Sequence, residues 1–171
     1  MSWKRKRTKQ TNGSSRSSPH AVATNTPGVE VIPEFLKAAV EKAADMAKDQ
    51  LASTGRITPA ALFVYGSDTV PETNRTIMVS LYWRNELQKE TARRRIREKA
   101  LAEGARAVVV LSIKDRTLMI SGRSSTNIPV TASVDYEYQR DTRVVSRWEV
   151  HWLNTPESDF FLEDIFDGPT S

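Results

Sequence analysis

Residues 130–152 read VTASVDYEYQRDTRVVSRWEVHW, and this stretch decides the fold because apolar and polar side chains alternate along both of its halves. Such alternation is typical of β-strands that bury one face and expose the other. The apolar positions are Val130, Ala132, Val134, Tyr136 and Tyr138 in the first half, and Val144, Trp148, Val150 and Trp152 in the second. The stretch therefore predicts a hairpin that turns around Asp141 and Thr142.

The register of this hairpin follows from the two-residue period of its strands. An odd number of loop residues keeps both apolar sets on one face, so we expect a three-residue loop with a bulge rather than a two-residue turn. Either odd register places Arg147 opposite Asp135 or Glu137. The charged side chains are then expected on the outer face of the sheet.

Four more strands are predicted upstream of the hairpin. Residues 107–113 are apolar on both faces of a strand, which favours a central position in the sheet. A KDRT turn leads to a shorter strand at residues 118–121, and residues 122–127 (GRSSTN) are expected to form a loop. Residues 61–65 and 76–83 are predicted strands, separated by a polar stretch too long for a tight hairpin.

Two amphipathic helices are also predicted. The first begins at Pro33 and is capped by Gly55, with apolar residues at three- and four-residue spacing between them. The second covers residues 86–103 and follows an N-cap candidate, Asn85, whose capping-box partner would be Gln88. A further short helix is expected near the C-terminus.

These elements predict an α+β fold. We expect a mostly antiparallel sheet of about five to six strands, with the two main helices on one face and a short C-terminal helix. Residues 1–28 are rich in Ser, Thr and basic residues and are expected to form a disordered basic tail. Residues 29–153 are expected to form the single α+β domain, followed by an acidic C-terminal segment, residues 154–171, that contains the short helix.

The net charge of +4 is unevenly distributed along the chain. The basic residues clustered in the N-terminal tail are Lys4, Arg5, Lys6, Arg7 and Lys9. Those clustered in the second helix are Arg93, Arg94, Arg95 and Arg97. Both clusters are candidate nucleic-acid-binding sites, since basic side chains bind polyanions by displacing counterions. The alternatives are a tail without specific function and a solvated, internally compensated helix face.

The acidic C-terminal segment also contains large apolar residues. They are Phe160, Phe161, Ile165 and Phe166. One interpretation is that they dock on the segment's own domain, because exposed Phe side chains are costly in water. The other is that they form a partner-binding motif, which inserts into a groove on another chain.

Catalytic and metal chemistry is weakly represented in this sequence. The absence of cysteine excludes disulfides and thiolate sites and suits a reducing compartment. His20 lies in the tail, and His151 lies on the polar face of the last strand near Glu149. Two acids spaced like Asp135 and Glu137 could bind a divalent cation, but cross-strand ion pairs explain them equally well. We predict no catalytic residue, no metal and no cofactor.

The motifs of phosphate loops, nucleophile elbows and dinucleotide-binding turns do not occur in the chain. A loop at residues 121–125 (SGRSS) could cradle an anion, although such loops are common. If the protein is an enzyme, which we do not favour, its polar site would lie near the last hairpin. The only residues worth testing would be Asp68, Asp135, Glu137, Glu149 and His151.

We therefore predict a non-catalytic binding or oligomerisation module. The alternative is a nucleic-acid-associated protein that uses the basic tail and the Arg-rich second helix, and the second alternative is an enzyme. The expected partners are a protein or a second copy of the chain, or else nucleic acid or another polyanion at the tail. No apolar run approaches the roughly 20 residues of a membrane span. We expect a cytoplasmic protein, or a nuclear one if the organism is a eukaryote.

Overall fold

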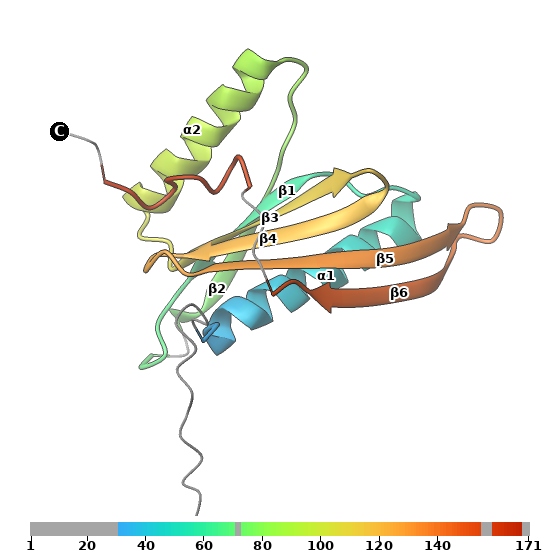
Figure 1. Cartoon of the computed structure of the whole chain (residues 1–171), viewed down its shortest axis with the longest axis horizontal. Coiled ribbons are helices and arrows are strands. Elements are labelled where there is room, and N and C mark those ends of the chain that lie inside the picture. The colour runs from blue at the N-terminus through green and yellow to red at the C-terminus, as the bar shows by residue number, and fades with distance from the viewer. Residues whose placement is uncertain (1–30, 71–72, 155–158, 169–171) are drawn as a thin grey trace, which may run out of the picture. The chain divides into compact units, whose positions relative to one another are not determined.

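The computed structural model describes residues 31–70, 73–154 and 159–168, which belong to one compact unit. The elements of this part of the chain are α1 (Glu34–Thr54), β1 (Ala60–Tyr65), β2 (Arg75–Ser80), α2 (Glu86–Ala102), β3 (Ala107–Lys114), β4 (Thr117–Ser124), β5 (Pro129–Gln139) and β6 (Val144–Trp152). The predicted α+β class and the order of these elements are confirmed (Figure 1). The predicted tail lies outside the described residues.

The strands form one antiparallel sheet of six strands in the order β2-β1-β3-β4-β5-β6. β3 is central, as its sequence predicts. Val108 and Val110 are buried on one face of the sheet, while Val109 and Leu111 are buried on the other. The continuous apolar run at β3 therefore contributes to two separate hydrophobic cores.

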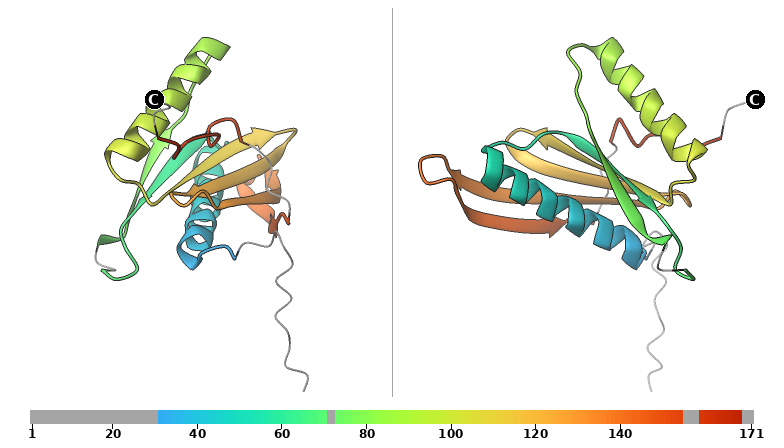
Figure 2. Two further views of the ribbon diagram at one scale, coloured as in Figure 1. Left: turned by 60° about the vertical axis from the view of Figure 1, so that its left-hand side comes forward. Right: turned by 180° about the vertical axis from the view of Figure 1, so that it is seen from behind.

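The expectation that both main helices cover one face of the sheet is wrong. α1 packs on the face that contains Leu62 and Val109, whereas α2 packs on the face that contains Phe63 and Val108. Figure 2 shows the two helices on opposite sides of the sheet. The physical reason is that β1 and β3 are apolar on both faces, and a single helical layer would leave one face in water.

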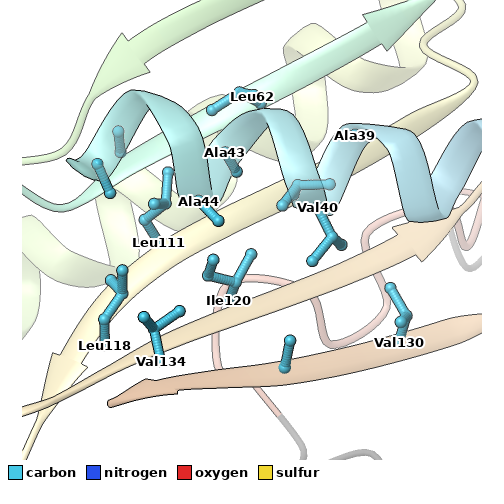
Figure 3. Packing of buried hydrophobic residues seen from close by; sticks show 14 of the residues in the cluster. Ala39, Val40, Ala43, Ala44, Leu62, Leu111, Leu118, Ile120, Val130 and Val134 are labelled. Atoms are coloured by element: carbon cyan, nitrogen blue, oxygen red, sulfur yellow. The ribbon is translucent and has the colours of Figure 1, made fainter. Parts of the chain in front are cut away.

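Close packing of α1 on the sheet depends on small residues. Ala39, Val40, Ala43 and Ala44 of the helix face the sheet residues of the first core (Figure 3). Gly122 lies beneath the start of α1, and an added Cβ there would come within 2.9 Å of Val130 Cγ1 and 3.2 Å of Leu36 Cδ1. The position favours glycine because a side chain there would collide with Val130 of the neighbouring strand and would also crowd Leu36 of α1.

Both helices have the caps that their sequences predict. Gly55 adopts a left-handed φ of 77° and its N–H donates to Leu51 O at 2.9 Å. The Asn85 side chain accepts a hydrogen bond from Gln88 N at 2.9 Å. In return, the Gln88 amide oxygen accepts from Arg84 N at 2.8 Å, one residue earlier than in an ordinary capping box.

The register of the last hairpin was only partly predicted. Four residues, 140–143, connect β5 to β6 instead of the expected three, since Gln139 pairs with Val144. A bulge after Glu137 adds one unpaired residue, so beyond it the apolar side chains of both strands again share one face of the sheet. Arg147 therefore lies opposite Glu137, which is one of the two expected partners. As a consequence Val145 packs against the first core, and Val144 is exposed.

Two predicted segments differ from the structure. β4 continues to Ser124, so the expected loop at residues 121–125 is mainly a strand and offers no anion-binding loop. The described residues 159–168 form consecutive turns instead of a helix, with Asp164 at a left-handed φ of 54°. A residue in that conformation interrupts an α-helix. The remainder of the expected helix, residues 155–158, lies outside the described residues.

Candidate functional site

The predicted nucleic-acid-binding residues fall into two groups. Lys4, Arg5, Lys6, Arg7 and Lys9 lie outside the described residues, so their role stays a prediction. Arg93, Arg94, Arg95 and Arg97 are all on α2. The contacts that these four arginines make within the domain differ from one residue to the next.

Two arginines of α2 hold the C-terminal segment. Arg93 Nη2 donates to Glu163 O at 3.1 Å, and the Arg93 guanidinium lies 5.1 Å from the centre of the Phe160 ring. Arg97 Nη2 donates to Asp167 O at 2.6 Å. Both side chains therefore make intramolecular contacts that nucleic-acid phosphates would have to replace.

The other two arginines lie on different parts of the helix surface. Arg94 forms an exposed ion pair with Glu98 at 3.7 Å, which is a four-residue helix pair. Arg95 makes no ion pair with any residue that the structure describes, and it lines a groove beside the sheet. The basic face expected from the sequence is thus divided among three environments.

The predicted partner-binding residues lie within the second core. Phe161 is 4% exposed and Ile165 is fully buried, and the Phe161 ring lies 5.0 Å from that of Trp83. Phe160 and Phe166 are partly buried against the same cluster. The segment is docked on its own domain, which was the first of the two interpretations. A role of these residues with another chain stays a prediction.

The charged cluster on the last hairpin is assembled as expected. His151 Nε2 lies 3.4 Å from Asp135 Oδ2 and 3.7 Å from Glu149 Oε2, and each of the three side chains is exposed. Each of them offers a ligand atom within 4.8 Å of the others, so the trio could contact a divalent cation. Arg147 already donates to Glu149 at 2.9 Å and lowers the pKa of that carboxyl group. Ion pairing therefore explains why these charged residues lie together without a bound cation.

Asp68, another enzyme candidate, is separate from this cluster. It follows β1, whereas the hairpin cluster lies on β5 and β6, and β3 and β4 intervene in the sheet. Asp68 pairs with Arg106 at 2.5 Å, and the guanidinium of Arg106 lies over the Phe35 ring at 3.6 Å from its centre. The structure therefore does not gather the five acid–base candidates at one place.

The most distinctive surface is the free edge of the sheet at β2. This strand pairs only with β1, and Ile77, Met78 and Val79 are 37%, 47% and 38% exposed. Its sequence, RTIMVS, contains one charged residue and no proline. Natural edge strands are usually protected against pairing by charges, proline or a bulge, and β2 has almost none of these features.

The opposite edge, β6, provides an internal comparison. That strand includes the exposed charged residues Arg147 and Glu149 and the exposed polar side chain of His151, and a bulge interrupts its pairing with β5. Both features discourage a further strand from pairing there. The two edges of the same sheet are therefore very different, and only β2 has the character of an interaction edge.

A groove accompanies β2 on each face of the sheet. On the α2 side a groove of about 590 Å³ lies between the helix and the strands, with Phe63, Leu81 and Ile96 among its lining residues. On the α1 side a groove of about 440 Å³ is lined by residues that include Met46 and Met78. Sequence reasoning missed this region, because the apolar run at residues 77–79 shows a strand but not whether that strand is at an edge.

Comparison with known proteins does not add a functional assignment. No family model matches the chain, and neither a curated protein nor a solved structure resembles it significantly. In the described part of the chain, neither helix combines the length and the apolar character that crossing a membrane requires.

Proposed function

We propose that this domain is a non-catalytic oligomerisation module, in which two copies join by pairing their β2 strands. The observation that carries this proposal is the unprotected edge at β2, where three consecutive apolar side chains are exposed. An edge strand directs main-chain N–H and C=O groups outward, so an additional strand gains hydrogen bonds as well as apolar contact.

The side chains of β2 complement those of a second copy. Two identical antiparallel strands are related by a two-fold axis. With this axis at Met78, Ile77 of one copy lies opposite Val79 of the other, and Thr76 lies opposite Ser80. Apolar side chains then meet apolar ones and hydroxyl groups meet hydroxyl groups, which are favourable cross-strand pairs.

Charges beside the strand also favour this arrangement. Lys42 of α1 donates a hydrogen bond to Thr76, while Asp49 of the same helix lines a groove together with Ser80. Because Thr76 and Ser80 of two copies are opposite in this register, Lys42 of each copy lies toward Asp49 of the other. Arg75 is the only charged residue of β2 and meets no like charge.

A cross-linking experiment tests both the pairing and its register. The chain contains no cysteine, so Met78→Cys introduces a single thiol at the proposed axis. Directly opposite residues of antiparallel strands lie within the Cα separation that a disulfide spans. We expect mild oxidation to give a covalent dimer, seen on a non-reducing gel. Val144→Cys is the control, since Val144 is 49% exposed on the protected edge β6.

Sedimentation equilibrium of the uncross-linked, full-length chain provides the second measurement. We expect the wild type and Val144→Lys to be dimers at micromolar concentration. Met78→Lys should be a folded monomer, because two ammonium groups would meet at the axis. A wild-type protein that stays monomeric at high micromolar concentration, together with equal cross-linking of the two cysteine variants, would contradict the proposal.

A further inference from the structure

We propose that the groove between α2 and the β1–β2 edge binds a small amphiphilic anion, such as a carboxylate or sulfonate with an apolar body. The groove shares Val79 and Ser80 with the β2 edge, but the ligand would bind on the α2 face of the sheet rather than to the main chain of that edge. The inference does not depend on the pairing of two copies. The volume of about 590 Å³ is within the range of roughly 300–1,000 Å³ that ligand pockets have.

The groove results from the way α2 is attached to the sheet. Of the residues of α2, only Ile96 and Ala100 are buried, and both belong to the second half of the helix. Figure 1 shows the first turns of α2 lying away from the sheet. The space beneath them is lined by Phe63, Leu81 and Ile96, which form an apolar floor.

The polar lining of the groove is basic. Arg84, Arg95 and Lys99 line it, and no acidic residue does so in the part of the chain that is described. Lys99 is already paired with Glu103 at 2.6 Å. The lining therefore combines an apolar floor with guanidinium groups, and this combination matches a ligand with an apolar body and an anionic head.

Two of these cations are available to such a ligand. Arg84 Nε donates to the Tyr82 hydroxyl at 2.8 Å, which orients the guanidinium without neutralising it. Neither Arg84 nor Arg95 forms an ion pair with a carboxylate among the described residues. Guanidinium groups bind carboxylate and sulfonate oxygens through charge-assisted hydrogen bonds, so an anionic head group would find partners here.

A small ligand suits this site better than nucleic acid does. The floor is apolar and concave, and Arg93 and Arg97 on the same helix are occupied by the main chain of the C-terminal segment. A nucleic-acid surface requires basic side chains that extend along a phosphate backbone. Arg84 and Arg95, by contrast, line a single concave groove.

The test uses anilinonaphthalene sulfonate, a fluorescent amphiphilic anion, with the full-length protein. We expect saturable binding, displaced by decanoate, that weakens about tenfold in Arg95→Gln because a charge-assisted hydrogen bond is lost. Arg94→Gln is the matched control: it removes the same charge from the same helix outside the groove and should leave the dissociation constant unchanged. Met78→Lys should also leave it unchanged, which separates the groove from the β2 edge.

Neutral phenylnaphthylamine distinguishes loss of charge from loss of the groove. Its affinity should be the same for the wild type and Arg95→Gln, and near-ultraviolet circular dichroism should be unaltered. The proposal is overturned if anilinonaphthalene sulfonate does not bind saturably, or if Arg94→Gln and Arg95→Gln weaken it equally. Displacement by a single-stranded oligonucleotide but not by decanoate would likewise reject a small-anion site and indicate a nucleic-acid surface.

Discussion

Tyr65 shows how a single polar contact is built into the second core. Its side chain is buried and donates a hydrogen bond to Glu103. Burial and this neighbouring carboxylate together raise the pKa of Tyr65 from 10.0 to about 12. The pKa of Glu103 is lowered because Lys99 and Tyr65 both donate to it.

This pair predicts a pH dependence of stability. In the unfolded chain Tyr65 ionises near pH 10, but the folded protein retains the proton until about pH 12. The free energy of unfolding should therefore fall as the pH rises from 10 to 12, because the folded state binds more protons than the unfolded state. Urea unfolding of the wild type and Tyr65→Phe checks this: the wild type should be more stable at pH 9, and the difference should shrink by pH 12.

Tyr82→Phe is the control for that measurement, since Tyr82 is largely exposed. It removes an exposed hydroxyl group from the same domain, so it shows how far the loss of a tyrosine hydroxyl outside the core changes stability. A difference between the wild type and Tyr65→Phe that stays constant from pH 9 to 12 would show that the Tyr65 hydroxyl does not titrate as described.

At the scale of elements, the N-terminal cap is an important local contact of α2. Its first turns bury no side chain, so packing contributes little there, and the hydrogen bond from Gln88 N to the Asn85 side chain is a main local stabiliser. The cap partner Gln88 is also one of the residues that line the groove.

Removal of this cap should have a measurable cost. We expect Asn85→Ala to lower the free energy of unfolding by about 1 kcal/mol, whereas Asn85→Asp should retain most of the stability because its carboxylate can accept the same hydrogen bond. Chemical denaturation of the two variants provides the comparison. Equal stability of wild type, Asn85→Ala and Asn85→Asp would show that the cap does not stabilise the helix.

At the scale of the whole molecule, the C-terminal segment completes the second core. Phe161 packs against Trp83, which follows β2, and the Arg93 and Arg97 side chains bind the segment's main chain. Asp159 begins the turns by accepting from Phe161 N at 2.9 Å, and burial raises the pKa of its carboxyl group. Elements distant in sequence are thus joined by the last residues that the structure describes.

The segment should therefore contribute to global stability. We expect Phe161→Ala to cost about 3–5 kcal/mol, as for other buried Phe residues, and the partly exposed Phe166→Ala to cost clearly less. Thermal and urea unfolding of both variants gives the comparison. A cost below about 1 kcal/mol for Phe161→Ala would mean that the segment is not part of the folded core, and would support its predicted role in binding a partner.

The main elements could be predicted because their signals are local. Pro33, Gly55 and Asn85 act within one helical turn, and the alternation along residues 130–152 requires only a two-residue period. The hairpin loop was harder to predict. A four-residue connection with a bulge in the strands keeps the apolar side chains on one face, and so does a three-residue loop. The local sequence does not distinguish these two solutions.

The candidate sites were less predictable because they depend on residues far apart in the chain. From the sequence alone, Arg93, Arg95 and Arg97 are equivalent members of one basic run. In the structure the C-terminal segment binds the first and the last of them, while Arg95 lines a groove whose floor comes from β1, from the residue after β2 and from α2. The helical period places these arginines on different sides of α2, but the elements that pack beside each side determine what each arginine contacts.

The hairpin at residues 130–152 shows most clearly which features come from local sequence and which come from tertiary packing. Its sequence by itself determined that two amphipathic strands pair there with Arg147 beside an acidic residue, because alternation and cross-strand charge are properties of the segment. Only the tertiary structure decided that this hairpin ends the sheet at its protected edge, that β2 forms the unprotected edge, and that the helices take opposite faces. Strand order arises from the burial of apolar surface over the whole domain, which no local pattern encodes. Helix placement follows from the two apolar faces of β1 and β3, which need a helix on each side only because the two strands are neighbours inside the sheet.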